Sequence, residues 1–224
     1  MQVYKVGIAE VAIAPLASKI KSALNAGPTL WLLSGGSNIK LSVAVMSRID
    51  AGLSGNLTVA LADERFGPYN HPDSNWAQLM DAGFDAKNAR LIEIIKPDSV
   101  DLESTRRRYA SELEIAMDES DSLIGQLGMG SDGHIAGILP GSLAAGDGEE
   151  LVIGYQSNPF TRLSVSFAGL RRLSAAFLIA FGEDKREQLE KLINQDVPLD
   201  VQPVQIIKQI NEAYIYNDQV EGKQ

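Results

Sequence analysis

Short runs of apolar and β-branched residues alternate with amphipathic segments along most of this 224-residue chain. A run of four to six such residues is typical of a buried strand, and a longer amphipathic stretch is typical of a helix. We expect strands at Val3 to Ile8, Thr29 to Leu33, Leu57 to Leu61, Ala89 to Ile94, Ser122 to Leu127, Leu151 to Tyr155, Leu163 to Phe167, Ala176 to Ala180 and Ala213 to Tyr216. We expect helices at Val11 to Asn25, Ile39 to Ile49, from about Asn75, at Asp101 to Met117 and Glu183 to Asn194, and helical turns near Val204 to Ile210. This alternation predicts an α/β fold, a mainly parallel sheet with helices on both faces.

No boundary between domains is visible in the sequence. The chain has no internal repeat, no low-complexity tract and no extended linker rich in proline, serine or glycine. The stretch Gly141 to Glu150 is rich in glycine and acidic residues, and we expect it to be a surface loop too short to separate domains. We therefore expect a single domain over residues 1 to 224.

Residue types that bind transition metals are scarce. The chain has no cysteine, which excludes disulfides, thiolate catalysis and sulfur-ligated metals. Its two histidines, His71 and His134, leave few nitrogen ligands for zinc. We therefore expect neither a catalytic metal nor a cofactor.

The net charge of -9 argues against a nucleic-acid partner, because nucleic-acid phosphates favour basic surfaces. A compact phosphate on a small molecule can still be held by a few local donors and cations. No apolar run is long enough for a membrane helix, and the first residues, MQVYKVGIAE, lack the features of a signal peptide. We expect a cytoplasmic protein with a small-molecule ligand and no membrane partner; its oligomeric state stays open.

A glycine loop follows the apolar strand TLWLL and precedes a helix. It consists of Ser34, Gly35, Gly36 and Ser37, followed by Asn38. Paired glycines let a backbone approach a ligand closely, and a helix start offers free amides and a positive dipole end to an anion. The same residues would also suit a plain turn between strand and helix. We expect a phosphate site here.

Three charged residues, Asp63, Glu64 and Arg65, come directly after the strand LTVALA. The carboxyl ends of strands are where open α/β sheets bind ligands, so Asp63 and Arg65 are candidates for the site. The alternative is a solvated turn with a surface ion pair. His71 lies in a polar loop next to proline, and we interpret it as a surface histidine.

The segment GMGSDGH follows another apolar strand, SLIGQL. Its glycines, Gly130 among them, permit a tight backbone that exposes His134, and an imidazole suits proton transfer at neutral pH. Asp132 could orient this imidazole. Although a single histidine is often structural, one framed by glycines at the end of a strand favours a catalytic role.

Cations for an anionic ligand come from the later part of the chain. Arg162 directly precedes a strand, and Lys185 opens a helix just after a strand and a glycine, so both are candidates for the site. Arg171 and Arg172 are interpreted as solvated, and an ordinary surface charge is the alternative for all four.

Taken together, these segments resemble the 6-phosphogluconolactonase family, within the group that includes glucosamine-6-phosphate deaminases. The resemblance covers nearly the whole chain and rests on SGGSN, DERFGPYNHPDSN, LGMGSDGHIAGILPGS and RLSVSFAGLRRLSAAFLIAFGEDK. It implies a Rossmann-like parallel-sheet fold of that group's type. It also implies hydrolysis of 6-phospho-D-glucono-1,5-lactone to 6-phosphogluconate in the pentose phosphate pathway.

The expected mechanism assigns one task to each loop. His134 would take a proton from water as the water attacks C1, and a cationic neighbour such as Arg65 would suit the developing oxyanion. Positioning of the substrate and bracing of the loop stay open as alternative roles for Asp63 and Arg65. Amides of residues 35 to 37, with Arg162 or Lys185, would hold the 6-phosphate. Departures from the family pattern are Asn38-Ile39 in place of Thr-Pro, Ala168 in place of proline, and Arg171 in place of asparagine. These departures concern substrate affinity more than reaction type.

Two other functions compete with this one. A glucosamine-6-phosphate deaminase would carry a glutamate where this chain has Leu139, and tends to have a tyrosine where it has Arg65. A catalytically silent protein that binds sugar phosphates is the other alternative, because a fold alone does not fix a function. Retention of both Asp132 and His134 argues against that protein.

Overall fold

A parallel sheet of seven strands forms the centre of the computed structural model, which describes residues 1–222. The strand order is β1-β10-β9-β6-β2-β3-β5, and all neighbouring strands run parallel. The strands of this sheet are β1 (Gln2–Lys5), β2 (Thr29–Leu33), β3 (Leu57–Leu61), β5 (Arg90–Ile92), β6 (Ser122–Leu127), β9 (Ala175–Ala180) and β10 (Glu212–Asn217). The fully buried strand β2 lies near the middle, as expected for a strand that is covered on both faces. The predicted α/β class is confirmed.

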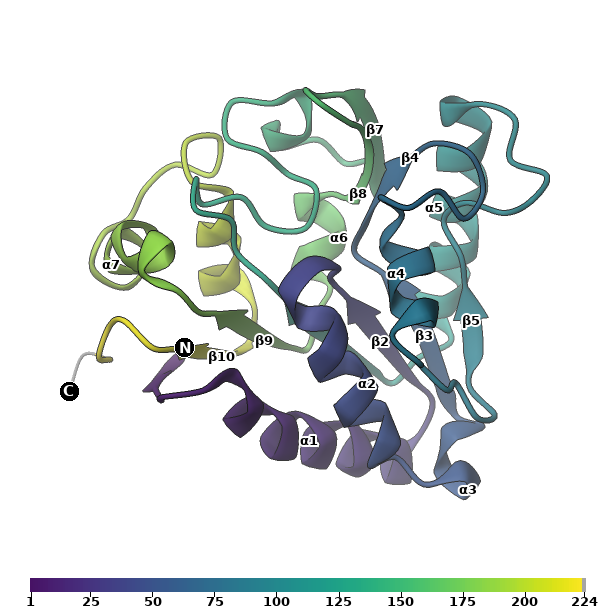
Figure 1. Cartoon of the computed structure of the whole chain (residues 1–224), viewed down its shortest axis with the longest axis horizontal. Coiled ribbons are helices and arrows are strands. Elements are labelled where there is room, and N and C mark those ends of the chain that lie inside the picture. The colour runs from purple at the N-terminus through teal and green to yellow at the C-terminus, as the bar shows by residue number, and fades with distance from the viewer. Residues whose placement is uncertain (223–224) are drawn as a thin grey trace.

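Helices cover both faces of this sheet (Figure 1). On one face α1 packs against α2 and α2 against α4, while α5 and α6 lie behind the sheet in the same view. Right-handed crossovers explain the division, because the chain builds β2, β3 and β5 in one direction and β6, β9 and β10 in the other. The helices are α1 (Ile13–Ala26), α2 (Ile39–Ser47), α3 (Ala51–Ser54), α4 (Asn75–Asp81), α5 (Leu102–Asp118), α6 (Phe167–Arg171) and α7 (Arg186–Asn194), with 3-10 turns η1 (Ala9–Ala12), η2 (Gly36–Asn38), η3 (Leu143–Ala145), η4 (Glu183–Lys185) and η5 (Pro203–Gln209).

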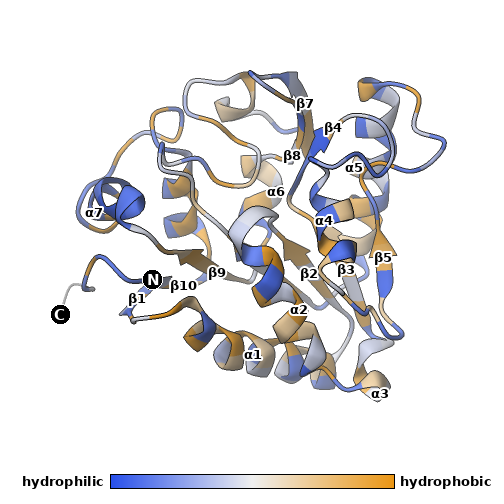
Figure 2. Cartoon of the chain, in the orientation of Figure 1, coloured by the Kyte–Doolittle hydropathy of each residue, from blue (hydrophilic) through white to orange (hydrophobic). Residues whose placement is uncertain are grey.

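A second, antiparallel sheet lies beside the main one and was not predicted. It has the order β4-β8-β7, with β4 (Asp63–Phe66), β7 (Val152–Gln156) and β8 (Thr161–Val165). The apolar character of β7 and β8 indicated strands but not the sheet to which they belong. β4 reads as a charged turn, and in Figure 2 it is blue while β2, β3 and β9 are orange. It is a strand because its backbone pairs with β8.

Two short helices and one loop also differ from expectation. α3 and α6 were not predicted, and residues 141 to 150 contain the turn η3, whose Ala144 and Ala145 are buried. Asp147 from this loop forms an ion pair with Arg171 at 2.6 Å. The segment is therefore a partly packed element and not a purely exposed loop.

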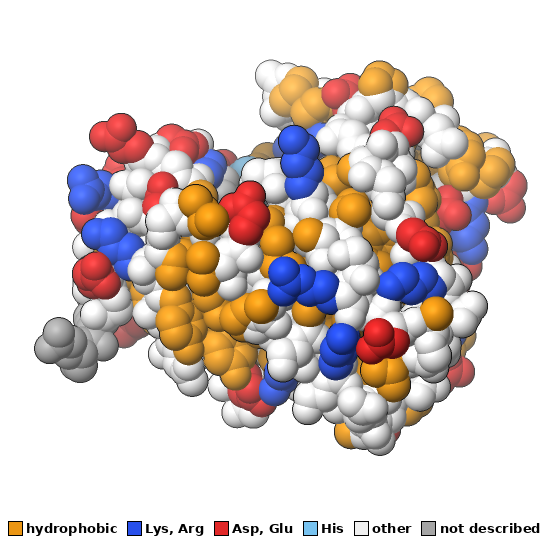
Figure 3. Space-filling model, turned by 60° about the horizontal axis from the view of Figure 1, so that its bottom comes forward, with side chains coloured by type: hydrophobic (Ala, Val, Ile, Leu, Met, Phe, Trp, Pro, Cys, Tyr) orange, Lys and Arg blue, Asp and Glu red, His pale blue; other side chains and the backbone are white. Residues whose placement is uncertain are grey.

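Figure 3 turns the α1 side of the molecule toward the reader. Apolar side chains gather on one part of this face, and positive and negative side chains are interspersed over the rest. The net charge of -9 is therefore not concentrated on this face. Among residues 1–222 no helix is long and apolar enough to cross a membrane.

Candidate active site

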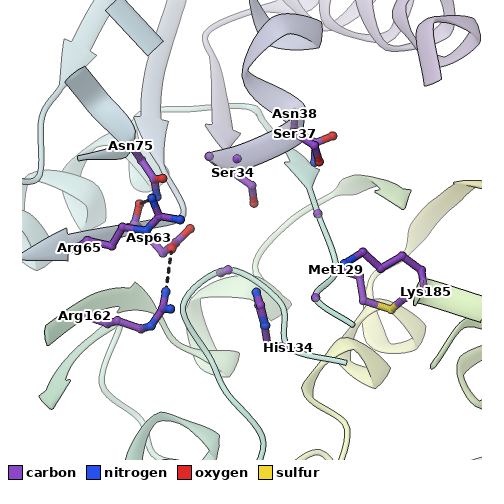
Figure 4. A pocket seen from close by; sticks show the side chains of 15 residues that line it. Ser34, Ser37, Asn38, Asp63, Arg65, Asn75, Met129, His134, Arg162 and Lys185 are labelled. Atoms are coloured by element: carbon purple, nitrogen blue, oxygen red, sulfur yellow. Dashed lines mark hydrogen bonds and ion pairs between the residues drawn. The ribbon is translucent and has the colours of Figure 1, made fainter. Parts of the chain in front are cut away.

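A polar cavity opens at the carboxyl ends of β2 and β6, the neighbouring strands at which the direction of sheet building reverses. Open α/β sheets bind their ligands at such a switch point, because the loops after the two strands diverge there. The volume of the cavity is about 220 Å³. It is lined by Ser34, Gly35, Gly36, Ser37, Asn38, Asp63, Arg65, Asn75, Gly128, Met129, Gly130, His134, Ala136, Arg162 and Lys185 (Figure 4).

The glycine loop forms one wall of this cavity and leads through η2 into α2. Gly36 has a φ of +64°, a left-handed conformation that glycine adopts without strain. Gly35 lies so close to Asn75 that a methyl group at its Cα would overlap the side-chain amide. The loop thus requires glycine at both positions, one for backbone conformation and one for close packing.

The opposite wall holds His134 on the loop after β6. Its Nδ1 lies 2.7 Å from Asp132 Oδ1, and the same oxygen accepts the His134 backbone N–H at 3.1 Å. The hydrogen bond from His134 lowers the pKa of Asp132 to about 2. An ionised carboxylate can only accept, so Nδ1 carries a proton, and in the neutral imidazole Nε2 is then the nitrogen with the lone pair.

The backbone around His134 is unusually tight. A methyl group at Gly130 would overlap both the His134 ring and the Asp132 carboxylate, so only glycine leaves room for this pair. Ala136, which lines the cavity, has a φ of +50°, a conformation that costs a non-glycine residue about 1–2 kcal/mol. Strained backbone of this kind occurs preferentially at functional sites.

β4 and β8 bring charged side chains to one side of the cavity. Asp63 is buried, and Arg162 Nη1 lies 3.9 Å from its Oδ2. Burial raises the pKa of Asp63, while the charges of Arg162 and Arg65 oppose that rise. Arg65 and Arg162 are directly opposite each other in the sheet, and both guanidinium groups lie against the ring of Phe160. Two like charges in this register favour an anionic group between or beside them.

Glu64 has a structural position that its sequence did not reveal. Its carboxylate accepts the backbone N–H groups of Asn75 at 2.7 Å and Trp76 at 3.0 Å, and the hydroxyl of Ser74 at 2.9 Å. Burial raises its pKa, while the hydrogen bonds from these donors oppose that rise because they favour the ionised form. Glu64 therefore fixes the start of α4 to β4.

The two remaining expectations concern His71 and the cations. His71 Nε2 lies 2.8 Å from the carbonyl oxygen of Arg65, outside the cavity lining, so it braces the loop. Lys185 reaches the cavity and also pairs with Asp184 at 2.8 Å. Arg171 and Arg172, which were interpreted as solvated, do not line the cavity; they form ion pairs with Asp147 and Asp118.

The structure brings all but one of the predicted site residues to one cavity. The exception, Asp132, contacts the His134 ring without lining the cavity. Residues of the lining that were not proposed for the site are Asn38, Asn75, Gly128, Met129 and Ala136. Asn75 lies in the HPDSN motif, so its sequence position carried a signal, whereas only the folded backbone reveals Ala136.

Four buried polar atoms in the lining have no hydrogen-bond partner among the described residues. They are Ser34 Oγ, Asn38 Nδ2, Arg65 Nε and Asn75 Oδ1. Buried polar groups are normally paired, so such a cluster indicates a site that a polar ligand or water completes.

A parallel sheet with a glycine-loop cavity at its switch point defines an α/β protein of the ligand-binding type. A family model described as glucosamine-6-phosphate isomerases/6-phosphogluconolactonase matches residues 5–216, and the chain belongs to this family.

Relatives and solved structures agree with this membership. The chain is 30% identical over 199 residues to 6-phosphogluconolactonase of Streptomyces coelicolor, a match that covers 80% of this chain and 76% of that one. It is 29% identical over 201 residues to the GDH/6PGL endoplasmic bifunctional protein of Oryctolagus cuniculus, covering 78% of this chain but 24% of that protein. The chain thus spans about a quarter of the bifunctional relative. The crystal structure of 6-phosphogluconolactonase from Thermotoga maritima has the same fold, with a TM-score of 0.81, 19% identity, and coverage of 96% and 97%.

Proposed function

We propose that this protein hydrolyses 6-phospho-D-glucono-1,5-lactone to 6-phosphogluconate, a step of the pentose phosphate pathway, with His134 as the general base. Membership of the family supports the substrate class. The observation that carries the proposal is the pairing of His134 Nδ1 with Asp132 at 2.7 Å, which leaves Nε2 available in the cavity.

The chemistry follows from that imidazole. Nε2 takes a proton from water while the water oxygen forms a bond to C1 of the lactone. The tetrahedral intermediate collapses, the bond from C1 to the ring oxygen breaks, and the imidazolium returns the proton to that oxygen. General acid–base catalysis of this kind contributes about a hundred- to ten-thousandfold.

Arg65 is the proposed stabiliser of the negative charge that develops on the carbonyl oxygen. Its Nη1 donates to the carbonyl oxygen of Asp73 at 3.0 Å, which positions the group, while its buried Nε has no partner among the described residues. A fixed donor aimed at developing charge lowers the barrier more than one that must reorganise. Asp63, through Arg162, is proposed to hold this part of the cavity in place.

The 6-phosphate is proposed to bind at the glycine loop. Amides of Gly35, Gly36 and Ser37 lie before α2, where free N–H groups and the helix dipole favour an anion. Lys185 and Arg162 lie on opposite sides of the cavity in Figure 4, with Lys185 on the side of Ser37. We therefore propose that Lys185 binds the phosphate and that Arg162 contributes to the other side of the cavity, next to Asp63.

Deamination of glucosamine 6-phosphate is the competing activity within the family. It requires ring opening and proton removal at C2 in addition to chemistry at C1. The position of the expected deaminase glutamate is occupied here by Leu139, a half-buried apolar residue outside the cavity lining, which cannot relay charge.

Metal independence is part of the proposal. Among residues 1–222 no three histidine, cysteine or acidic side chains form a group that could hold a metal ion. A chelator should leave the rate unchanged, and activity that is lost in chelator and restored by a divalent ion would contradict this part.

The single-domain organisation and the cytoplasmic location also stay predictions. Limited proteolysis tests the first, and cell fractionation tests the second.

An assay with two substrates tests the proposed function. Freshly made lactone should be hydrolysed well above its spontaneous rate. The product, 6-phosphogluconate, is measured by coupling to its dehydrogenase, and a no-enzyme control gives the spontaneous rate. Glucosamine 6-phosphate should release no ammonia. Ammonia release without lactone hydrolysis would favour the deaminase. The absence of both reactions would favour a protein that only binds the sugar phosphate.

A further inference from the structure

Asn75 presents a hydrogen-bond acceptor for which the described residues supply no donor. The residue is 2% exposed and lines the cavity at the start of α4. Its Nδ2 donates to the carbonyl oxygen of Asp63 at 3.0 Å, which fixes the orientation of the amide. Oδ1 lies against Gly35 and has no partner. Water or a ligand group that reaches this edge of the cavity is therefore left to supply the donor.

The phosphate cannot be that group. A phosphate dianion presents only acceptor oxygens, and two facing acceptors repel each other. A substrate hydroxyl, in contrast, can donate. The amide of Asn75 is thus chemically matched to the sugar ring and not to its charged substituent.

The position of Asn75 narrows the choice of hydroxyl. In Figure 4 it lies beside Asp63 and Arg65, across the cavity from Lys185, where the phosphate is assigned. In a 1,5-lactone the phosphate is carried on C6, attached to C5, and C2 and C3 lie across the ring from C5. The hydroxyls on C2 and C3 are therefore the ones that point away from the phosphate end.

We propose that Asn75 is a specificity-determining residue that accepts a hydrogen bond from the C2 or C3 hydroxyl of the lactone. This inference rests on the proposed function. Gly35 supports the same role, because only a glycine at this position of the glycine loop leaves room for the amide of Asn75 at the edge of the cavity.

Mono-deoxy lactones separate this role from a structural one. The lactones lacking the C2, C3 or C4 hydroxyl are compared with the parent, each corrected for its spontaneous rate. Wild type should lose about five- to tenfold in kcat/KM on the C2- or the C3-deoxy lactone, the effect of one neutral hydrogen bond. The Asn75→Ala variant should have a kcat/KM on the parent lactone that is lower than wild type by the same factor. On the deoxy lactone to which wild type is sensitive, the variant and wild type should have equal kcat/KM.

Gln78→Ala is the matched control. Gln78 lies one turn along α4, and its Nε2 donates to the carbonyl oxygen of Pro72 at 3.0 Å, outside the cavity lining. It should behave like wild type with every lactone. The proposal would be overturned if the ratio of kcat/KM between the parent and each deoxy lactone is the same for Asn75→Ala as for wild type.

Two further outcomes keep the test decisive. If Asn75→Ala does not fold, the wild-type protein alone tests the proposal. Equal kcat/KM of wild type on the parent, the C2-deoxy and the C3-deoxy lactones would overturn it. If wild type hydrolyses no lactone, the proposed function fails, and calorimetric binding of 6-phosphogluconate and its C2- and C3-deoxy forms still tests Asn75. A preference of about five- to tenfold for the full compound supports it, and equal dissociation constants contradict it.

Discussion

At the scale of single residues, the position of His134 depends on two neighbours in its own loop. Asp132 holds Nδ1, and Gly130 leaves the space that the ring and the carboxylate occupy. The sequence allowed the contact between His134 and Asp132 to be predicted, because a glycine-framed Asp-x-His unit after a strand is a recognisable pattern. It did not allow the left-handed Ala136 to be predicted, since nothing in an alanine indicates a positive φ.

Gly130→Ala should displace the imidazole without unfolding the protein. The added methyl overlaps the His134 ring and the Asp132 carboxylate, so we expect kcat to fall at least about a hundredfold, approaching the loss of the base itself. Gly52→Ala is the control, because a methyl there meets no atom within 4 Å. Circular dichroism checks folding, and a Gly130→Ala variant with full kcat would contradict the geometry.

Asp132→Asn should lower kcat about ten- to a hundredfold, because an amide no longer selects the tautomer with a free Nε2. The pH dependence of stability provides an independent check. The folded pKa of Asp132, about 2, lies below its ordinary 3.8, so the ionised form contributes stability above that ordinary value. The difference in free energy of unfolding between wild type and Asp132→Asn should shrink as pH falls from about 4 through about 2. A difference that grows in acid would show that the carboxylate is not stabilised by His134.

At the scale of elements, the site depends on the connection between β4 and α4. The seven parallel strands could be predicted because most of them are apolar runs, although β1 and β5 are shorter than expected. β4 could not, because its residues are charged and its pairing with β8 joins segments about a hundred residues apart in the chain. Glu64 illustrates the same difficulty: a buried carboxylate that receives three backbone N–H groups and one hydroxyl looks like a surface acid in the sequence.

Glu64→Gln should destabilise this connection. The new amide turns one acceptor into a donor that faces N–H groups, which should lower the free energy of unfolding by about 1–3 kcal/mol. Glu114→Gln, at an exposed position of α5, should change it by less than about 0.5 kcal/mol. Urea unfolding measures both variants, and equal stability of Glu64→Gln and wild type would contradict the assigned role.

At the scale of the whole molecule, the cavity is assembled from segments between Ser34 and Lys185 that meet only in the folded sheet. Their convergence could be predicted in outline, because carboxyl ends of parallel strands share one edge. The separation of Lys185 from Arg162 could not, because the antiparallel sheet that carries Arg162 was not predicted.

Lys185→Ala tests the assignment of the phosphate. A charge-assisted contact to a phosphate supplies ground-state affinity, so KM should rise about ten- to a hundredfold while kcat changes little. Lys191→Ala on α7, where the lysine pairs with Glu187, serves as the control and should keep both constants. A fall in kcat alone would place the phosphate elsewhere.

The central claim is that His134 is the base for lactone hydrolysis, and His134→Ala tests it most directly. The steady-state rate is measured on fresh 6-phosphogluconolactone, with the spontaneous rate subtracted and folding verified by circular dichroism. We predict that kcat falls about a hundred- to ten-thousandfold while KM stays within a few-fold of wild type, because the phosphate site is intact. A folded His134→Ala protein that hydrolyses the lactone at the wild-type rate would contradict the claim.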